Sequence, residues 1–311
     1  MPFNEYQHAN DTLNYLMGLL IFADATIGLI CNVFIIVIFF RVGEMRNSFS
    51  LICLFRAFNN TFVLVEFIID FLPLTIWGWT PLSLFLESTM LSFGNTLYVA
   101  NQWICILLAL NRFIAIYFYK YYSKFCAFRP TLANIETFGF YYNPDIMSIE
   151  YPIYTSVTNA TLTDGGNIEL DLFEIMTKIF TASAVILNVL TFLKISHYYI
   201  TESQTETQFA RERIKKNAKL FLQTFLQDSL YIVDMLFMMY FSTLSGSRFW
   251  GFISWTFVWC NVHSTDGVIM LLFTEHKKSL SSLFVQISTN DEKRRWASRT
   301  SQLKTFTSTR Y

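Results

Sequence analysis

Apolar runs long enough to cross a lipid bilayer constrain this chain more than any other feature of its sequence. The run from Leu86 to Tyr117 exceeds the roughly 20 residues that a helix needs to cross about 30 Å of hydrocarbon. Arg112 lies near its end, and Lys120 and Lys124 follow it. An apolar run that ends in cations is typical of a helix that leaves the membrane on the cytoplasmic side. We therefore orient the other runs relative to this one.

Six runs of this kind are present, and the composition agrees with them. Hydrophobic residues make up 53% of the 311 residues and charged residues only 15%, which is too few charges to cover a surface that faces water. We therefore predict an all-α membrane protein whose transmembrane region covers residues 15–274. The predicted spans are residues 15–40, 48–76, 86–117, 172–195, 220–244 and 249–274.

The positions of Lys and Arg predict which segments face the cytoplasm. Residues 1–14 contain neither, whereas the first run ends at Arg41, so we place the N-terminus outside. Residues 130–177 also lack both and are rich in Asp and Glu, so we place them outside as well. The basic segment 211–219 and the tail, residues 275–311, are expected in the cytoplasm.

With this orientation the charges require seven crossings, and one is missing between residues 129 and 145. That stretch contains no apolar run of spanning length. We interpret the fourth helix as lost from this sequence through a skipped exon or a faulty gene model. A genuine six-helix variant and a re-entrant segment are the alternatives.

Two glycosylation sequons lie in segments that we place outside. Asn10 begins the sequence Asn-Asp-Thr, and Asn159 begins Asn-Ala-Thr. Chance occurrence is the alternative for each. We predict that both asparagines carry glycans.

Charged residues inside the predicted spans indicate a polar layer. Ionisable side chains are costly in a membrane and usually face a partner or a cavity. Arg56, Asp228 and Asp266 each lie 8 residues from the predicted cytoplasmic end of their span, which is about 12 Å along a helix axis. Asn32 lies at the same depth. We hypothesise that Asp228 and Asp266 neutralise Arg56, and that the layer is either purely structural or a switch.

Other polar residues fall in the predicted outer half of the spans and are candidates for facing a ligand. They are Asp24, Tyr98, Lys178 and Asp234. Pairing of Lys178 with Asp234 is one possibility for this group, and contact of Lys178 with an acidic ligand group is the other. Helix packing is the alternative role for the aromatic residues at this depth.

Several sequence blocks, in the same order along the chain, resemble nematode serpentine receptors of class X, a family of chemoreceptor-type G protein-coupled receptors. One block, Arg46-Asn47-Ser48-Phe49, enters the second span, and Leu110-Asn111-Arg112-Phe113 ends the third. The remaining blocks are Phe140-Tyr141-Tyr142-Asn143-Pro144, Phe221-Leu222-Gln223, Leu226-Gln227-Asp228 and His263-Ser264-Thr265-Asp266-Gly267.

This resemblance implies a rhodopsin-like seven-transmembrane bundle, with a ligand in its outer half and a heterotrimeric G protein at its inner face. Arg112 would be the pivot for G-protein coupling. The neighbouring residue is usually acidic in such receptors and is Asn111 here, so a charge-assisted lock between neighbours is not available. The resemblance also implies a multi-pass protein of the plasma membrane in a sensory cell, with no cofactor, no metal site and no nucleic-acid partner.

Three other functional classes were weighed against a receptor. A transporter or channel is expected to show internal repeats with helices broken by Gly or Pro. This chain shows no internal repeat, and its last three spans lack Pro. An intramembrane aspartyl protease would use Asp228 and Asp266, but Arg56 at the same depth would keep both ionised when one must carry a proton. A non-signalling membrane protein or a non-functional truncated receptor product remains the alternative. We expect no enzymatic activity.

Overall fold

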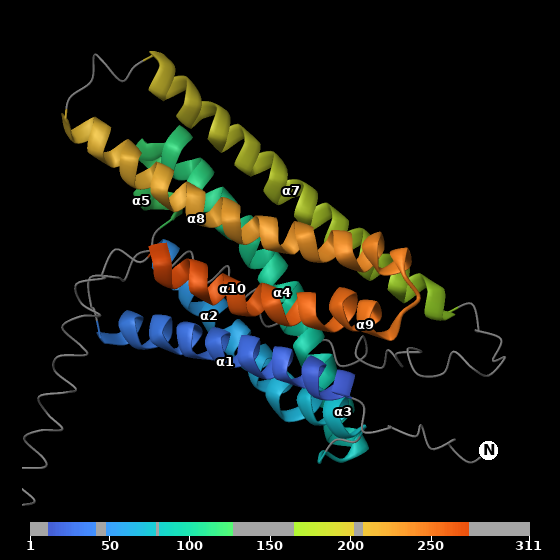
Figure 1. The fold of residues 1–311 in the computed structure, drawn as a ribbon. Helices are drawn as coiled ribbons and strands as arrows, with labels where there is room; N and C mark the ends of the chain where they lie inside the picture. The colour runs from blue at the N-terminus through green and yellow to red at the C-terminus, as the bar shows by residue number, and fades with distance from the viewer. Residues whose placement is uncertain (1–11, 42–47, 79–80, 127–164, 202–207, 274–311) are drawn as a thin grey trace, which may run out of the picture. The chain divides into compact units, whose positions relative to one another are not determined.

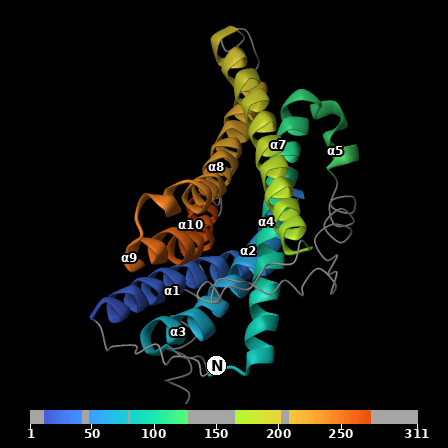
Figure 2. The same ribbon diagram turned by 90° about the vertical axis from the view of Figure 1, so that its right-hand side faces the viewer.

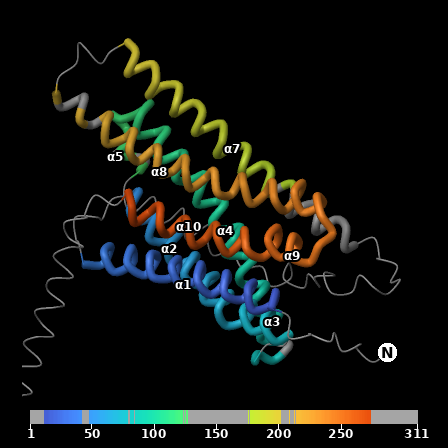
Figure 3. Tube along the Cα trace, viewed as in Figure 1, coloured from blue at the N-terminus to red at the C-terminus, as the bar shows by residue number. Residues whose placement is uncertain are grey.

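The computed structural model describes residues 12–41, 48–78, 81–126, 165–201 and 208–273. Helices make up almost all of these residues, so the predicted all-α architecture is confirmed (Figure 1). The expectations for Asn10, Asn159, the crossing between residues 129 and 145 and the tail at 275–311 lie outside the described residues. Figure 3 traces the described helices in colour.

Helices lie over each of the six apolar runs. α1 covers Thr12–Arg41, and the second run forms α2 (Ser48–Glu66), the π-helical turn η2 (Phe67–Phe71) and α3 (Leu72–Trp77). α4 covers Leu84–Tyr117 and is followed by the 3-10 turn η3 (Tyr119–Tyr121) and α5 (Tyr122–Phe125). α7 covers Gly165–Thr201 and α8 covers Gln208–Met239. The 3-10 turn η5 (Phe241–Leu244), α9 (Arg248–Gly251), the π-helical turn η6 (Phe252–Phe257) and α10 (Val258–Phe273) complete the described chain.

Local chemistry accounts for several helix ends and irregularities. Pro73 has no N–H to donate to the preceding turn, and the π-helical turn η2 lies immediately before it. Gly78 ends α3 with φ 71°, a conformation that favours glycine, and its N–H donates to the Leu74 carbonyl. Ser83 and Ser247 cap the N-termini of α4 and α9 through their hydroxyl groups.

Four helical segments of the described chain are long and apolar enough, by length and composition, to cross a membrane. They are Thr12–Arg41, Ser48–Trp77, Phe85–Tyr117 and Thr177–Thr201. α8 and α10 complete the packing: α1 contacts α2 and α10, α8 contacts α10, and both α7 and α8 contact α4. We call the two ends of these helices the Thr12 end and the Arg41 end, after the first and last residues of α1.

α4 and α7 run in the same direction (Figures 1 and 2). Along α4, Trp103 meets Phe180 and Tyr117 hydrogen-bonds to Leu190, so contacts advance together along both helices. α4 therefore finishes at the Arg41 end, whereas α7 begins at the Thr12 end. The connection between Phe125 and Gly165 starts at one end of the helices and finishes at the other.

The core consists of two apolar clusters with polar residues between them. One cluster lies toward the Arg41 end and includes Ile35, Phe49 and Met270. The other lies toward the Thr12 end and includes Ile21, Val63 and Cys260. Fully buried polar residues separate the two along α1, α2, α4 and α10, namely Asn32, Arg56, Asn60, Asn101, His263 and Asp266.

Candidate functional site

A buried ion pair occupies the centre of the polar residues between the two clusters. Arg56 Nε of α2 lies 2.7 Å from Asp266 Oδ2 of α10, and both side chains are 0% exposed. Arg56 Nη1 donates to Cys105 Sγ of α4 at 3.3 Å. Its guanidinium carbon lies 5.1 Å from the ring centroid of Tyr231 on α8. Arg56 is thus contacted from three other helices at once.

The carboxylate of Asp266 also accepts hydrogen bonds from two amides. Asn60 Nδ2 donates to Oδ2 at 2.6 Å, and Gln227 Nε2 of α8 donates to Oδ1 at 2.8 Å. A buried carboxylate is stable only when its charge and lone pairs have partners. Asp266 meets that condition by joining α2, α8 and α10.

Asn60 extends this arrangement toward α1 and α4. Its Oδ1 accepts from Asn101 Nδ2 at 2.9 Å, and its Nδ2 lies 3.4 Å from Asn32 Oδ1. Asn32 Nδ2 donates to the carbonyls of Gly28 and His263 at 2.8 and 3.3 Å. The four hypothesised layer residues are therefore not one contact group, because Asn32 reaches Asp266 through Asn60.

A hydrogen-bond relay connects the ion pair with residues nearer the Thr12 end. Trp259 Nε1 donates to His263 Nε2 at 3.1 Å, so this nitrogen is the acceptor and a neutral imidazole carries its proton on Nδ1. Nδ1 lies 2.8 Å from Asn60 Oδ1 and donates to it. Asn60 in turn donates to Asp266. We call this series, Trp259 to His263 to Asn60 to Asp266, the relay.

Aromatic rings surround the first member of the relay. The Trp259 ring meets Phe67 and Phe71 edge to face at 5.1 and 5.7 Å between centroids, and Tyr98 at 6.4 Å. We call these four residues the aromatic cluster. Because edge-to-face contacts depend on ring orientation, a group that displaces one ring would also change the position of the Trp259 indole.

Asp228 does not form the direct ion pair with Arg56 that we hypothesised from the sequence. Its Oδ2 accepts from Asn188 Nδ2 of α7 at 2.6 Å, and the ion pair of Arg56 within the described residues is with Asp266 alone. The preceding residue, Gln227, makes the contact with Asp266. Neighbouring residues on a helix point about 100° apart, so Asp228 has the expected depth but faces α7 and α4.

The candidate ligand-facing residues fall into separate places. Asp234 Oδ2 accepts from the Tyr98 hydroxyl at 2.6 Å, and both side chains are buried. Asp24 is half-buried and accepts from Asn261 Nδ2 at 3.1 Å. Lys178 lies exposed on α7. Tyr98 and Asp234 are thus brought together next to the aromatic cluster.

The Arg41 end of α4 holds the two residues that were assigned to G-protein coupling. Arg112 and Asn111 are both buried. The guanidinium carbon of Arg112 lies 3.9 Å from the ring centroid of Phe49 on α2, a cation–π contact. Asn111 Oδ1 accepts from the Tyr122 hydroxyl of α5 at 3.2 Å, and the Ser48 hydroxyl donates to the Cys126 carbonyl. These bonds fold the segment after α4 back against α2.

Comparison with known proteins identifies the family to which this chain belongs. The family model described as serpentine type 7TM GPCR chemoreceptor Srx matches residues 22–274. The chain belongs to the Srx family. It is also 25% identical over 301 residues to "Serpentine receptor class X 45" of Caenorhabditis elegans, which covers 89% of this chain and 82% of that protein.

The resemblance inferred from the sequence blocks is therefore confirmed, and the Srx match includes the relay and the Arg112 region. Sequence reasoning nevertheless missed several residues of the relay and its surroundings. Asn60 follows Arg56 by four residues on the same face of α2, a spacing that indicates a shared contact. His263 likewise lies four residues after Trp259 and three before Asp266 on α10. No comparable signal marks Asn101 or Asn188, because their partners lie on other helices.

A pair of buried carboxylates at the Thr12 end of this Srx chain was also not proposed as a site. Glu66 and Asp70 are each 3% exposed, and among the described residues no donor hydrogen-bonds to Glu66 Oε1 or Asp70 Oδ1. Gly94 of α4 makes room for Glu66, since a Cβ at this position would lie 2.1 Å from Glu66 Oε2. In the described part of the chain no group of three or more His, Cys, Asp or Glu residues is placed to hold a metal ion.

Proposed function

We propose that this chain is a chemosensory receptor of the plasma membrane that activates a heterotrimeric G protein. The family match over residues 22–274 is the observation that carries the proposal. In this proposal the Thr12 end faces outside and binds the ligand, and the Arg41 end faces the cytoplasm and contacts the G protein. We expect no catalytic activity, in keeping with membership of a receptor family.

The aromatic cluster and the relay support a route for the signal. A ligand that displaces Phe67, Phe71 or Tyr98 changes the position of Trp259, and with it the hydrogen bond to His263. That change passes through Asn60 to Asp266, whose other partners include Gln227 of α8. Ligand binding thereby alters the equilibrium between two arrangements of α8, to the extent that the ligand prefers one of them.

The surroundings of Arg112 support a role for it at the G-protein face. In the described structure its guanidinium group stacks on Phe49 of α2. Its neighbour Asn111 is neutral and bonds to Tyr122. Because Asn111 carries no charge, it cannot give Arg112 the charge-assisted bond that a carboxylate at position 111 would give. We therefore expect nucleotide exchange in the absence of ligand.

The test is ligand-independent nucleotide exchange by the full chain. The receptor is reconstituted in lipid nanodiscs with purified G proteins of each major class, and binding of a non-hydrolysable GTP analogue is followed. We expect exchange above that of the G protein alone with at least one class. Arg112→Ala should abolish this increase, whereas Arg41→Ala, which removes an exposed cation at the end of α1, should retain it.

Asn111→Asp provides a second arm of the same experiment. A carboxylate at this position can bond to Arg112, and we expect basal exchange to fall by about tenfold, which corresponds to about 1.4 kcal/mol of preference for the resting arrangement. Equal exchange by Arg112→Ala and the unmodified chain, at equal amounts of folded receptor, would contradict the proposed coupling role.

A further inference from the structure

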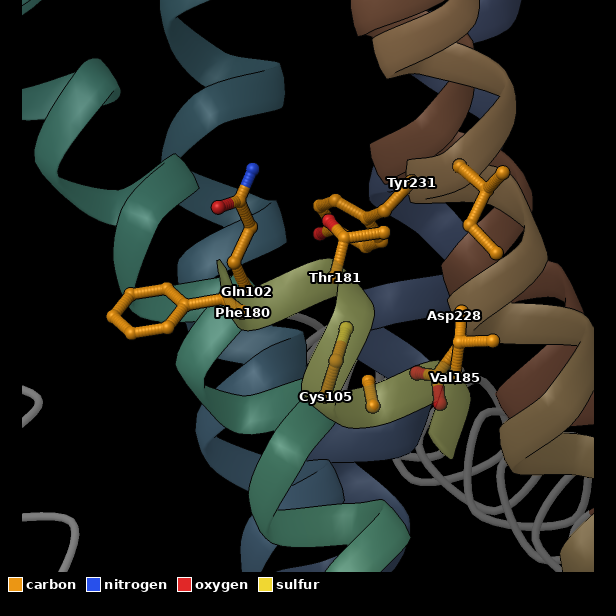
Figure 4. A pocket seen from close by; sticks show the side chains of 9 residues that line it. Gln102, Cys105, Phe180, Thr181, Val185, Asp228 and Tyr231 are labelled. Atoms are coloured by element: carbon orange, nitrogen blue, oxygen red, sulfur yellow. The ribbon is translucent and has the colours of Figure 1, made fainter. Parts of the chain in front are cut away.

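A small cavity lies between α4, α7 and α8, apart from the relay. Gln102 and Cys105 of α4, Thr181 and Phe180 of α7, and Asp228 and Tyr231 of α8 contribute to its lining (Figure 4). The cavity has room for about one water molecule. The Asp228 carboxylate points across it toward Cys105.

Three buried oxygen atoms of the lining residues have no hydrogen-bond partner within the described structure. They are Asp228 Oδ1, Gln102 Oε1 and the Tyr231 hydroxyl oxygen. The three residues are 3–4% exposed, so bulk water does not satisfy these atoms. Buried polar atoms are nearly always paired in folded proteins. An unpaired carboxylate oxygen of Asp228 beside a cavity therefore indicates that a bound species completes its bonding.

The charges next to the cavity favour a cation over a neutral species. Asp228 and Asp266 bring two negative charges to this level of the helices, and Arg56 brings one positive charge. Asp266 takes the ion pair with Arg56. Asp228 has the amide of Asn188 and the thiol of Cys105 as hydrogen-bond partners, and Arg56 also acts electrostatically on its carboxylate. Two buried negative charges at this level therefore share one positive charge.

We propose that this cavity binds a compact monovalent cation against Asp228, with the Tyr231 hydroxyl as a further oxygen donor. The size of the cavity excludes bulky cations. Two sources have the required chemistry: a free ion such as Na⁺, and the primary ammonium group of an organic ligand. The second source rests on the proposed receptor function, because it would make the cavity the place where a ligand's charged end is bound.

Thermal unfolding of the detergent-purified full chain tests the proposal without a G protein. The unfolding temperature is measured at constant ionic strength in chloride salts of Na⁺, of methylammonium and of N-methylglucamine, the last being too bulky for the cavity. A cation that binds only the folded protein raises the unfolding temperature with a saturable dependence on its concentration. We expect such a rise with Na⁺ or methylammonium relative to N-methylglucamine.

The pattern of responses identifies the source of the cation. A rise with Na⁺ alone assigns the site to a free ion, and a rise with methylammonium alone assigns it to an ammonium group. A rise with both supports a site that accepts either. No difference among the three salts would mean that only water or a proton completes the cavity, and the proposal would be overturned.

Matched variants locate the effect. Asp228→Asn removes the charge while keeping the shape, and it should raise the half-saturating concentration by at least tenfold. Tyr231→Phe removes one oxygen and should raise it several-fold, which provides a test if Asp228→Asn fails to fold. Glu212→Gln, which removes an exposed carboxylate on α8, should leave the salt response unchanged. An undiminished response in both cavity variants would also overturn the proposal.

Discussion

At the scale of single residues, Arg56 is the most consequential side chain in the described structure. It is completely buried, and its charge is offset by Asp266 at 2.7 Å. A buried ion pair contributes little net stability, because desolvation opposes the attraction of the charges. Removal of one partner is different, since it leaves the other charge buried without compensation. Each of these two residues is therefore needed to compensate the buried charge of the other.

Arg56→Ala should lower the free energy of unfolding by about 3–5 kcal/mol and reduce surface expression, because Asp266 then loses its counter-ion. The double variant with Asp266→Ala should lose less than the sum of the two single variants. Unfolding of the purified chains and surface labelling measure both effects, with Lys219→Ala, an exposed cation on α8, as control. Additive losses in the two single variants would argue against a direct pair.

At the scale of helices, α1 and α10 approach each other closely because of two glycines. A Cβ at Gly28 of α1 would lie 2.5 Å from Ser264 Cα of α10, and one at Gly267 of α10 would lie 2.4 Å from Asn32 Nδ2. The two helices can come this close only because both positions are glycine. α1 and α10 are therefore closely packed against each other.

Gly28→Ala should destabilise the protein by about 1–3 kcal/mol, because the added methyl group meets backbone atoms that cannot rotate away. Gly251→Ala is the matched control, since a Cβ there has no heavy atom within 4 Å. Its unfolding temperature should be unchanged or slightly higher, as Ala is a better helix former than Gly. Similar losses in both variants, measured by thermal unfolding, would show that helix approach is not the cause.

The polar layer shows how far sequence reasoning reaches at this scale. Depth along a helix follows from counting residues at 1.5 Å each, and the count brought Arg56 and Asp266 to the same level. Direction around the axis depends on how each helix is rotated, which a sequence does not state. For this reason Asp228 was expected beside Arg56, whereas Gln227 makes the contact with Asp266 and Asp228 bonds to Asn188. The all-helical membrane fold, in contrast, could be predicted from the lengths of the apolar runs alone.

At the scale of the whole molecule, the parallel course of α4 and α7 bears on the number of crossings. The chain leaves α4 and α5 at the Arg41 end and enters α7 at the Thr12 end. If both helices span the bilayer, the connection between them must cross it as well. The distribution of basic residues predicts an odd number of crossings, and the parallel course of α4 and α7 supports that prediction.

Both sequons should therefore be glycosylated when the chain is expressed in cells. Removal of glycans by glycosidase should increase gel mobility in two steps, and Asn10→Gln and Asn159→Gln should each abolish one step. Modification of Asn10 with Asn159 accessible only from the cytosol would show that the connection does not cross. A tag inserted between α7 and α8, N-terminal to the basic segment, checks on which side of the membrane that segment lies.

The hydrogen bond from Gln227 to Asp266 affects how strongly one arrangement of α8 relative to α10 is favoured. It is the described side-chain hydrogen bond that links α8 to the carboxylate of α10. A hydrogen bond to a charged group is worth about 1.5–3 kcal/mol net, a factor of roughly 10 to 150 in population. Under the proposed function, spontaneous release of this bond sets a low background of signalling, above which a stimulus must be detected.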